Sequence, residues 1–310
     1  MKKDYMTSND LGKVSVSILV VNYNAGPLLA DCVRTGLEQA EEIVVVDNAS
    51  SDGSMEALVE QFPLETRLKM VRSERNLGFA AGCNLGAKST TRSYILFLNP
   101  DCVLEPGALQ RLVEVLEANP DAGMVGGLLI DPDGTEQGGG RRAVPTPWRS
   151  LVRATGLYRF ANRCPSLFFD FHLYKQPLPD APVEVEAISG ALMLVWRKAM
   201  EDIGSWDEGY FLHCEDLDWC MRYRQKGWRI MFVPNARVVH HKGACSKTQP
   251  IFVEWHKHKG MMRFYRKFFR NQYPGILMGI VALGVWLRFG VVATWYSVRK
   301  AGIIFGIRRK

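Results

Sequence analysis

Residues 95–105 read ILFLNPDCVLE, an apolar run that stops at Asn99-Pro100-Asp101 and then becomes apolar again. A short apolar run that ends on turn residues is typical of a fully buried strand in a parallel sheet. Asp101 therefore follows directly on a strand that the pattern predicts to be buried. The presence of a carboxylate at that point calls for an explanation in terms of fold or function.

Two earlier segments have the same design. Residues 14–24, VSVSILVVNYN, are β-branched and apolar and end in polar residues, and Pro27 opens the helical stretch that follows. Residues 43–54, IVVVDNASSDGS, repeat the short strand and polar turn, in which Asp52 or Ser54 can cap the next helix. Strands that alternate with helices predict an α/β fold, with a mainly parallel central sheet and helices on both faces.

Polar residues at three of these strand ends form a candidate site. They are residues 22–24, the pair Asp47-Asn48, and residues 99–101. In parallel sheets ligands sit beyond the carboxyl ends of the strands, so we expect these side chains on one rim. A single Asn or Asp at such a position often does no more than begin a turn. Three such ends in succession favour a binding site.

The rest of the chain up to about residue 240 continues the α/β pattern. Residues 107–120 have the apolar spacing of a core-facing helix. Residues 143–180 are rich in Pro and aromatic residues with little periodicity, which predicts irregular structure that covers the sheet and shapes specificity. A further helix is predicted over about 214–226, closed by Gly227 and followed by a strand.

The positive charge is concentrated in the C-terminal tail. The chain has a net charge of +7, but its last acidic residue is Glu254, and residues 255–310 contain 12 Lys and Arg. Before position 255, the chain contains 27 basic and 32 acidic residues. Tails of this kind bind anionic surfaces, either membrane or nucleic acid.

The seven cysteines are scattered and form no C-x-x-C pair and no spacing suited to structural zinc. We expect reduced thiols in a cytosolic environment. The first ten residues, MKKDYMTSND, lack the apolar core of a signal peptide.

Seven segments, in this order, resemble family 2 glycosyltransferases with the GT-A fold: VNYN, VVDNASSDGS, RNLGFAAGCNLGA, FLNPD, SGALMLVWR, DEGYFLHCEDLDWCMR and ARVVHHKGACS. They cover roughly residues 15–250. The combination of NPD with NLGFAAGCN is similar to rhamnosyltransferases that use dTDP-L-rhamnose and act on lipid-linked glycans. The resemblance implies a catalytic GT-A domain over residues 1–250 and a separate basic, apolar helical segment over residues 251–310.

The resemblance implies a metal site at the end of the NPD strand. Asp101 matches the last Asp of the family's D-x-D motif, which binds Mg²⁺ or Mn²⁺, and Asn99 replaces the first, with an amide that can still hydrogen-bond a ribose hydroxyl. His241 matches a family histidine that completes the metal shell or touches the diphosphate, and the doubled sequence leaves His240 as the alternative. A cation there would hold the charge that grows on the nucleoside diphosphate as the sugar leaves.

The resemblance also implies the donor site. The residues expected to contact or shape it are Asn22, Tyr23, Asn24, Asp47, Asn76, Gly78, Phe79 and Asn99. For Gly78 and Gly82, close helix packing or a positive φ is an equally good interpretation. Arg141 and Arg142 could clamp an anionic acceptor or simply be solvated. Trp219 and Tyr223, at helical spacing, are more typical of core than of a sugar platform.

Asp216 in HCEDLDWC matches the family's catalytic base. In an inverting single displacement this carboxylate takes the proton from the attacking acceptor hydroxyl. The alternative is that Glu215 and Asp216 simply begin a helix, where the macrodipole favours acidic residues. Glu215 is expected to contact substrate, and Arg222 to orient a carboxylate. No Q-x-x-R-W motif of processive members is present, so transfer of a single sugar is expected.

The apolar part of the tail, residues 274–298, is long enough to cross a hydrocarbon layer of ~30 Å at ~1.5 Å per residue. Arg288 interrupts it, and a charge at mid-depth costs at least ~2.5 kcal/mol. A single span would also carry the last basic residues across the membrane, against the positive-inside tendency. We therefore expect peripheral or monotopic attachment to the cytoplasmic face of the membrane, with a true span as the second interpretation. The third is a helix docked on the catalytic domain or on a second copy of the chain.

The sequence therefore predicts an inverting, metal-dependent glycosyltransferase that moves one L-rhamnose from dTDP-L-rhamnose to a lipid-linked glycan in cell-surface polysaccharide or cell-wall synthesis. The alternatives are a UDP-hexose donor, or an inactive subunit that only binds sugar nucleotides. Nucleic acid is not an expected partner, because the apolar stretch 275–298 suits a membrane surface better.

Overall fold

A computed structural model describes residues 14–243 and 249–304, the last four of these by their backbone alone. The strands are β1 (Val14–Asn22), β2 (Ala40–Asp47), β3 (Leu68–Arg72), β4 (Tyr94–Leu98), β5 (Cys102–Leu104), β6 (Ala122–Ile130), β7 (Arg141–Arg142), β8 (Val183–Glu184), β9 (Ala187–Ile188), β10 (Leu192–Trp196) and β11 (Arg229–His240). The α-helices are α1 (Leu28–Gln39), α2 (Ser54–Gln61), α3 (Phe79–Ala87), α4 (Ala108–Ala118), α5 (Pro147–Ala154), α6 (Pro165–Phe168), α7 (Arg197–Ile203), α8 (Glu215–Gln225), α9 (Pro250–Phe269) and α10 (Gly275–Ile304). Two 3₁₀ turns, Leu157–Phe160 and Leu173–Lys175, complete the described elements.

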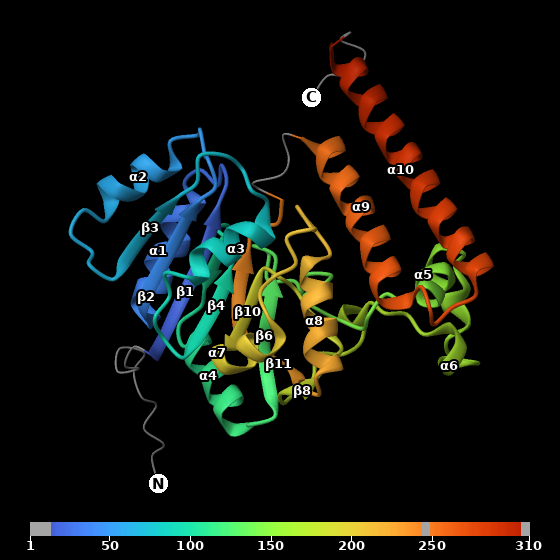
Figure 1. The fold of residues 1–310 in the computed structure, drawn as a ribbon, viewed down its shortest axis with the longest axis horizontal. Helices are drawn as coiled ribbons and strands as arrows, with labels where there is room; N and C mark the ends of the chain where they lie inside the picture. Colours follow the sequence, from blue (N-terminus) through green and yellow to red (C-terminus); the bar gives the residue numbers. More distant parts are fainter. Residues whose placement is uncertain (1–13, 244–248, 305–310) are drawn as a thin grey trace. The chain divides into compact units, whose positions relative to one another are not determined.

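The described chain divides into two compact units. The first contains the described parts of Met1–Ala143 and Asp216–Cys245, together with His172–Glu208. The second contains Val144–Phe171, Gly209–Glu215 and the described part of Ser246–Lys310. The sheets and the first four helices all belong to the first unit (Figure 1).

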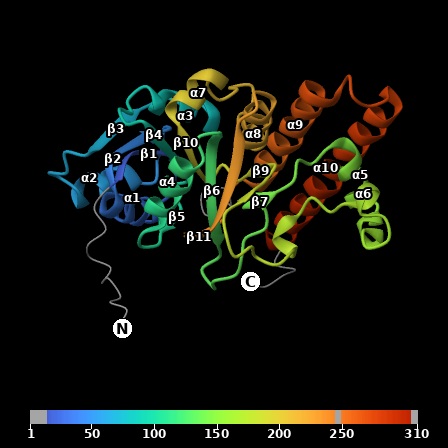
Figure 2. The same ribbon diagram turned by 90° about the horizontal axis from the view of Figure 1, so that it is seen from below.

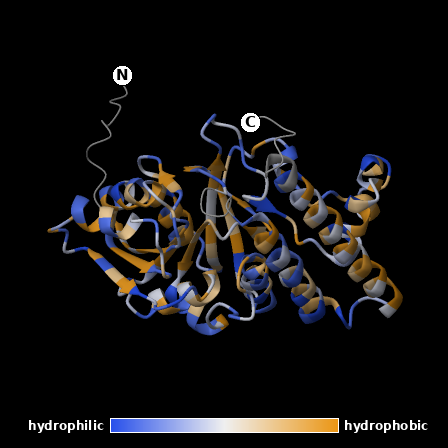
Figure 3. Cartoon of the chain, turned by 90° about the horizontal axis from the view of Figure 1, so that it is seen from above, coloured by the Kyte–Doolittle hydropathy of each residue, from blue (hydrophilic) through white to orange (hydrophobic). Residues whose placement is uncertain are grey.

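The first unit is built on one large, mostly parallel sheet in the order β3-β2-β1-β4-β10-β6-β11-β5, with β8 paired to β11. The pairs β3/β2, β2/β1, β1/β4 and β6/β11 are parallel, whereas β10 runs antiparallel to both of its neighbours. The inner strands are apolar along their length (Figure 3), because both of their faces are covered. The predicted α/β fold with a mainly parallel sheet is confirmed.

Helices cover both faces of this sheet, with α1 and α4 on one side and α3 and α7 on the other (Figure 2). Side-chain alternation along β1 sets the two layers. Ile18 packs in the core cluster beneath α1 and α4. Val21, on the opposite face, lies so close to Gly82 of α3 that a Cβ at Gly82 would meet it at 2.7 Å. Gly82 therefore allows close packing of helix on strand, which is one of its two predicted roles.

Residues 143–180 are not as irregular as predicted. Residues 147–154 form α5, which begins with Thr146 accepting a hydrogen bond from the Arg149 backbone N–H and with Pro147 at its first position. Thr-Pro is a local helix-start signal, and it outweighs the poor periodicity of so short a helix. The segment 144–171 belongs to the second unit.

The second unit contains the long helices α9 and α10. Helix α10 packs against α9, where Trp255 contacts Trp286 and Phe289 with ring centroids 5.3 and 5.4 Å apart. The Tyr265 hydroxyl of α9 donates a hydrogen bond to Ser150 of α5 at 2.7 Å, and burial raises the pKa of Tyr265. Within Gly275–Lys300, α10 is long and apolar enough to cross a membrane by length and composition, and only 6% of its most apolar window is buried.

Candidate active site

The polar strand ends lie on one rim of the sheet. Asn22 at the end of β1 pairs in register with Asp47 at the end of β2. On the other side of β1, Val20 pairs with Leu98, the last residue of β4, so Asn99 and Asp101 follow at the same level. The predicted convergence of the first strand ends follows from this parallel register.

The turn after β2 is held by this rim. The Asn22 amide donates hydrogen bonds to Ser50 and Ser54 at 3.0 and 2.9 Å. Asp47 is buried, and its Oδ1 accepts from the Ser50 backbone N–H at 2.9 Å. Burial alone would raise the pKa of Asp52, but hydrogen bonds from Ser54 and the Gly26 backbone lower it. Asp47 Oδ2 has no hydrogen-bond donor among the described residues, so it can accept from a ligand.

A second turn carries Asn76, Gly78 and Phe79. The Asn48 amide donates to Asn76 Oδ1 at 3.0 Å and to the Gly78 carbonyl at 3.2 Å. Gly78 has a φ of 84°, which only glycine adopts without strain. Asn76 and Gly78 therefore shape the turn that begins α3. Tyr23 and Asn24 extend β1 beyond its last residue, and the Asn24 side chain accepts from the Ser51 backbone N–H at 2.8 Å.

Asp101 and His240 form the core of a candidate metal site. His240 Nε2 lies 3.2 Å from Asp101 Oδ1, and both side chains are buried. Asn99 lies beside them, with its amide nitrogen 3.4 Å from the same ring nitrogen. His241 contacts Asp101 through its backbone N–H, which donates to the Asp101 carbonyl at 2.9 Å. Of the doubled histidines, His240 has its imidazole at Asp101.

Gln137 fixes the orientation of the His240 ring. Its amide nitrogen donates to Asp131 Oδ1 at 2.7 Å and to the His240 carbonyl at 2.6 Å. Its amide oxygen therefore faces His240 Nδ1 at 2.8 Å, and Nδ1 carries the proton. In a neutral ring this leaves the lone pair of Nε2 facing Asp101.

The arrangement fits a divalent cation. Asp101 Oδ1 is buried and has no hydrogen-bond donor in the described structure. A lone pair on Nε2 and a carboxylate oxygen 3.2 Å apart repel each other unless a cation or a proton lies between them. Cys102 lies within the same cluster, but its thiol donates to the Ala191 carbonyl at 3.6 Å. The remaining oxygen and nitrogen ligands suit Mg²⁺ or Mn²⁺.

Asp216 is held by three donors. Oδ2 accepts from Arg142 and from the Gly190 backbone N–H at 3.2 Å, and Oδ1 accepts from the Leu217 backbone N–H at 2.8 Å. Arg142 therefore pairs with the candidate base. Ala191, which follows Gly190, accepts a hydrogen bond from the Asn99 backbone N–H at 3.0 Å, so this short segment connects Asp216 to the candidate metal site.

The backbone before Asp216 adopts an uncommon conformation. His213 and Cys214 have φ values of 68° and 71°, in the left-handed region that non-glycine residues rarely occupy. Strain of this kind persists where the surroundings fix it, often beside functional groups. It sets the direction from which the chain enters α8 at Glu215, which is buried.

Arg222 and the aromatic residues of α8 have structural contacts. Arg222 pairs with buried Asp218 at 2.8 Å and donates to backbone carbonyls at the end of α7 and just after it. Trp219 and Tyr223 are fully buried, and Trp219 packs edge-to-face on Phe97 with ring centroids 5.3 Å apart. Arg222 is not brought to Asp101 or Asp216, and the two aromatics are core, as expected.

Sequence reasoning did not find Gln137. It lies in a loop without periodicity, 103 residues before His240, and no local pattern marks it. Arg142 was a candidate for an acceptor clamp, but its partner here is Asp216. Arg141 is buried and pairs with Glu136 at 2.8 Å.

Comparison with known proteins places the chain in a family. Residues 17–178, more than half of the chain, match the model for glycosyl transferase family 2. The chain belongs to this family. It is a glycosyltransferase, and the prediction of its family and enzyme class is confirmed.

Rhamnosyltransferases are among the relatives of this family 2 enzyme. It is 28% identical to the N-acetylglucosaminyl-diphospho-decaprenol L-rhamnosyltransferase of Mycobacterium tuberculosis, over 75% of this chain and 78% of the relative. It is 25% identical to the rhamnosyltransferase WbbL of Escherichia coli, over 48% of this chain and 52% of the relative.

Solved structures confirm the GT-A fold of this family 2 enzyme. The mannosyltransferase PcManGT of Pyrobaculum calidifontis, solved with GDP-Man and Mn²⁺, matches with a TM-score of 0.56 and 17% identity, over 99% of this chain and 85% of that chain. GalNAc-T7, solved with UDP, GalNAc and Mn²⁺, matches with a TM-score of 0.55 and 20% identity, over 74% of this chain and 44% of that chain.

Proposed function

We propose that this family 2 enzyme transfers one L-rhamnose from dTDP-L-rhamnose to a hydroxyl of a lipid-linked glycan, with inversion at the sugar carbon. The donor and acceptor classes are supported by the relative from Mycobacterium tuberculosis, whose name states an L-rhamnosyltransferase acting on a decaprenyl diphosphate sugar. The observation that carries the proposal is the buried Asp101–His240 pair at the rim where β1, β2 and β4 end.

Asp101 and His240 are the proposed ligands for Mg²⁺ or Mn²⁺. When bound, the cation would stabilise the negative charge that develops on the departing diphosphate. Few protein ligands suit such an ion, because phosphate oxygens and water complete its shell. In this proposal His240 takes the place first assigned to His241.

Asp216 is the proposed general base. A carboxylate has about four lone-pair positions. Arg142 and Gly190 occupy Oδ2, and Leu217 occupies one position of Oδ1. The remaining position of Oδ1 is available to accept the proton of an acceptor hydroxyl within about 2.6–3.2 Å. Arg142 and Gly190 thus hold the carboxylate while Oδ1 reacts.

The donor nucleoside is proposed to lie on the rim formed by Asn22, Tyr23, Asn24 and Asp47. Asp47 Oδ2 would accept a hydrogen bond from the base or ribose. Asn99 would donate to the ribose or diphosphate, and Phe79, together with the turn of Asn76 and Gly78, would bound the sugar. Glu215 remains a proposed acceptor contact, whereas the contacts of Arg222 favour a structural role.

Attachment to the cytoplasmic face of the membrane is proposed through α10. One side of this helix is exposed and apolar, comprising Ile276, Ile280, Leu283, Leu287, Val291, Trp295 and Val298. Arg288 is exposed as well, and its charge acts on His258 of α9. Burial of the apolar stripe in the lipid interface would hold the enzyme beside a lipid-linked acceptor.

A panel of nucleotide sugars tests the donor. With Mg²⁺ or Mn²⁺ present, dTDP-L-rhamnose should raise the unfolding temperature more than UDP-hexoses do, because a ligand that binds only the folded state stabilises it. The Asp101→Ala variant should lose the metal-dependent part of this shift. Transfer to a lipid-linked acceptor then separates an enzyme from an inactive binding subunit. A larger shift with a UDP-hexose would refute the rhamnose assignment.

A further inference from the structure

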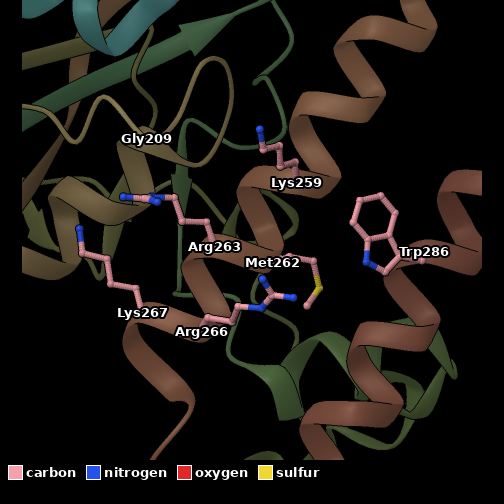
Figure 4. A pocket seen from close by; sticks show the side chains of 7 residues that line it. All are labelled: Gly209, Lys259, Met262, Arg263, Arg266, Lys267 and Trp286. Atoms are coloured by element: carbon pink, nitrogen blue, oxygen red, sulfur yellow. The ribbon is translucent and has the colours of Figure 1, made fainter.

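The second unit contains a pocket of its own, formed by α9, α10 and the start of the segment Gly209–Glu215. Its volume is about 490 Å³, within the usual range of small-molecule sites. The lining residues are Gly209, Lys259, Met262, Arg263, Arg266, Lys267 and Trp286 (Figure 4). Four of the seven are cations and none is acidic, so the pocket is complementary to a polyanion.

The four cations follow helical spacing along α9 and are exposed. Like charges this close repel one another unless an anion lies between them. In the described chain Lys257 pairs with Glu254 at 3.3 Å, whereas Lys259 and Arg266 have no ion pair. Burial, and then the charge of Lys259, lower the pKa of His256.

Two lining side chains are held in place before any ligand binds. The Arg263 guanidinium lies over the Tyr210 ring at 5.3 Å and so close to Gly209 that a Cβ there would overlap it. Figure 4 shows this guanidinium reaching toward Gly209. Trp286 packs against Trp255, with ring centroids 5.3 Å apart. A site whose groups are already oriented loses less entropy on binding.

The apolar surface beside the pocket indicates the kind of anion. Leu283 and Leu287 lie within one turn of Trp286 on α10, and each is 61% exposed. A ligand with a phosphate group in the pocket and a hydrocarbon chain along this stripe would satisfy both surfaces. Arginine forks and lysine ammonium groups are the side chains that bind phosphate best.

We propose that this pocket binds the diphosphate headgroup of the polyprenyl lipid that carries the acceptor glycan. The identity of the lipid rests on the proposed function, whereas the pocket and its charges do not. The pocket would therefore select a diphosphate lipid rather than merely attract the chain to an anionic membrane.

Vesicle binding by the full-length protein tests this proposal. One set of vesicles contains phosphatidylcholine with a polyprenyl diphosphate, and the other contains phosphatidylglycerol at matched surface charge. Arg266→Gln removes a pocket charge, and Arg270→Gln, at the C-cap of α9 and outside the pocket, removes the same charge as a control. Gly209→Ala displaces the Arg263 guanidinium without changing any charge.

Arg266→Gln and Gly209→Ala should each lower the affinity for diphosphate vesicles about tenfold, the effect of losing one charge-assisted hydrogen bond. Arg270→Gln should change the affinity for diphosphate vesicles by no more than about twofold. The two arginine variants should bind phosphatidylglycerol vesicles with the same affinity. Equal losses for these two arginine variants on both vesicle types would overturn the proposal, and so would soluble pyrophosphate binding as tightly as the lipid. Vesicle binding is measured without sugar transfer, so this test can be interpreted even if the proposed reaction is not observed.

Discussion

Replacing Gln137 with Leu tests whether this amide prepares His240 to bind metal. Gln137 is 3% exposed and accepts from His240 Nδ1 at 2.8 Å, so Leu removes the group that fixes the ring tautomer. Loss of such a partner lowers metal affinity about 10–100-fold, equivalent to about 1.4–2.7 kcal/mol. The buried His240 Nδ1–H loses its acceptor, which should lower stability by about 1–3 kcal/mol. The His240 carbonyl keeps the hydrogen bond from the Lys242 backbone N–H at 2.8 Å, and Asp131 is only part-buried, so these two groups add little to the loss.

Mn²⁺ binding measured by electron paramagnetic resonance, in the presence of dTDP, gives the affinity without any need for turnover. Asp131→Asn is the matched control, because its side-chain oxygen still accepts from Gln137 and the tautomer of His240 is kept. Its Mn²⁺ affinity should change by about threefold or less. A folded Gln137→Leu variant that binds Mn²⁺ as tightly as the unmodified protein would refute the reasoning.

Three further predictions address the base, the second histidine and acid stability. Asp216→Asn should bind donor normally and lose about 10²–10⁴-fold in kcat, measured by sugar transfer, and full turnover would exclude Asp216 as the base. His240→Ala should abolish metal-dependent donor binding in calorimetry while His241→Ala keeps most of it, and the reverse order would move the site to His241. Burial alone would raise the pKa of Glu42, but hydrogen bonds led by the one from Lys69 lower it from 4.5 to about 2. Glu42 should therefore contribute about 3 kcal/mol of stability above pH 4.5 that is lost as the pH falls toward 2, so urea midpoints of Glu42→Gln should depend less on pH in this interval than those of the unmodified protein.

The sheet and its rim could be predicted because their signals are local. The turn residues Asn99-Pro100-Asp101 mark the end of an apolar strand in the sequence itself. Parallel pairing then places such strand ends at one edge of the sheet, independently of the loops that connect the strands. Local signals also located two helices. The apolar spacing within α4 predicted that helix, and the glycine that closes α8 lies just after its last residue.

The neighbouring sequence does not determine which of His240 and His241 faces Asp101. In β11, His240 pairs with Cys102 and Val238 with Leu104, so strand alternation turns the His240 ring to Asp101. The alternation is visible in the sequence, but its phase depends on how β11 aligns with β5, more than a hundred residues earlier in the chain.

The sequence by itself determined the α/β architecture, the polar rim with Asp47 and Asp101, and the apolar, basic end of the chain, because periodicity, turn residues and charge act over a few neighbouring positions. Only the tertiary structure decided that Gln137 orients His240, that Arg142 pairs with Asp216, and that Gly209 joins α9 and α10 around a basic pocket. These contacts join residues from 50 to more than 100 positions apart through loops without periodicity, and such contacts are set by the packing of the whole fold.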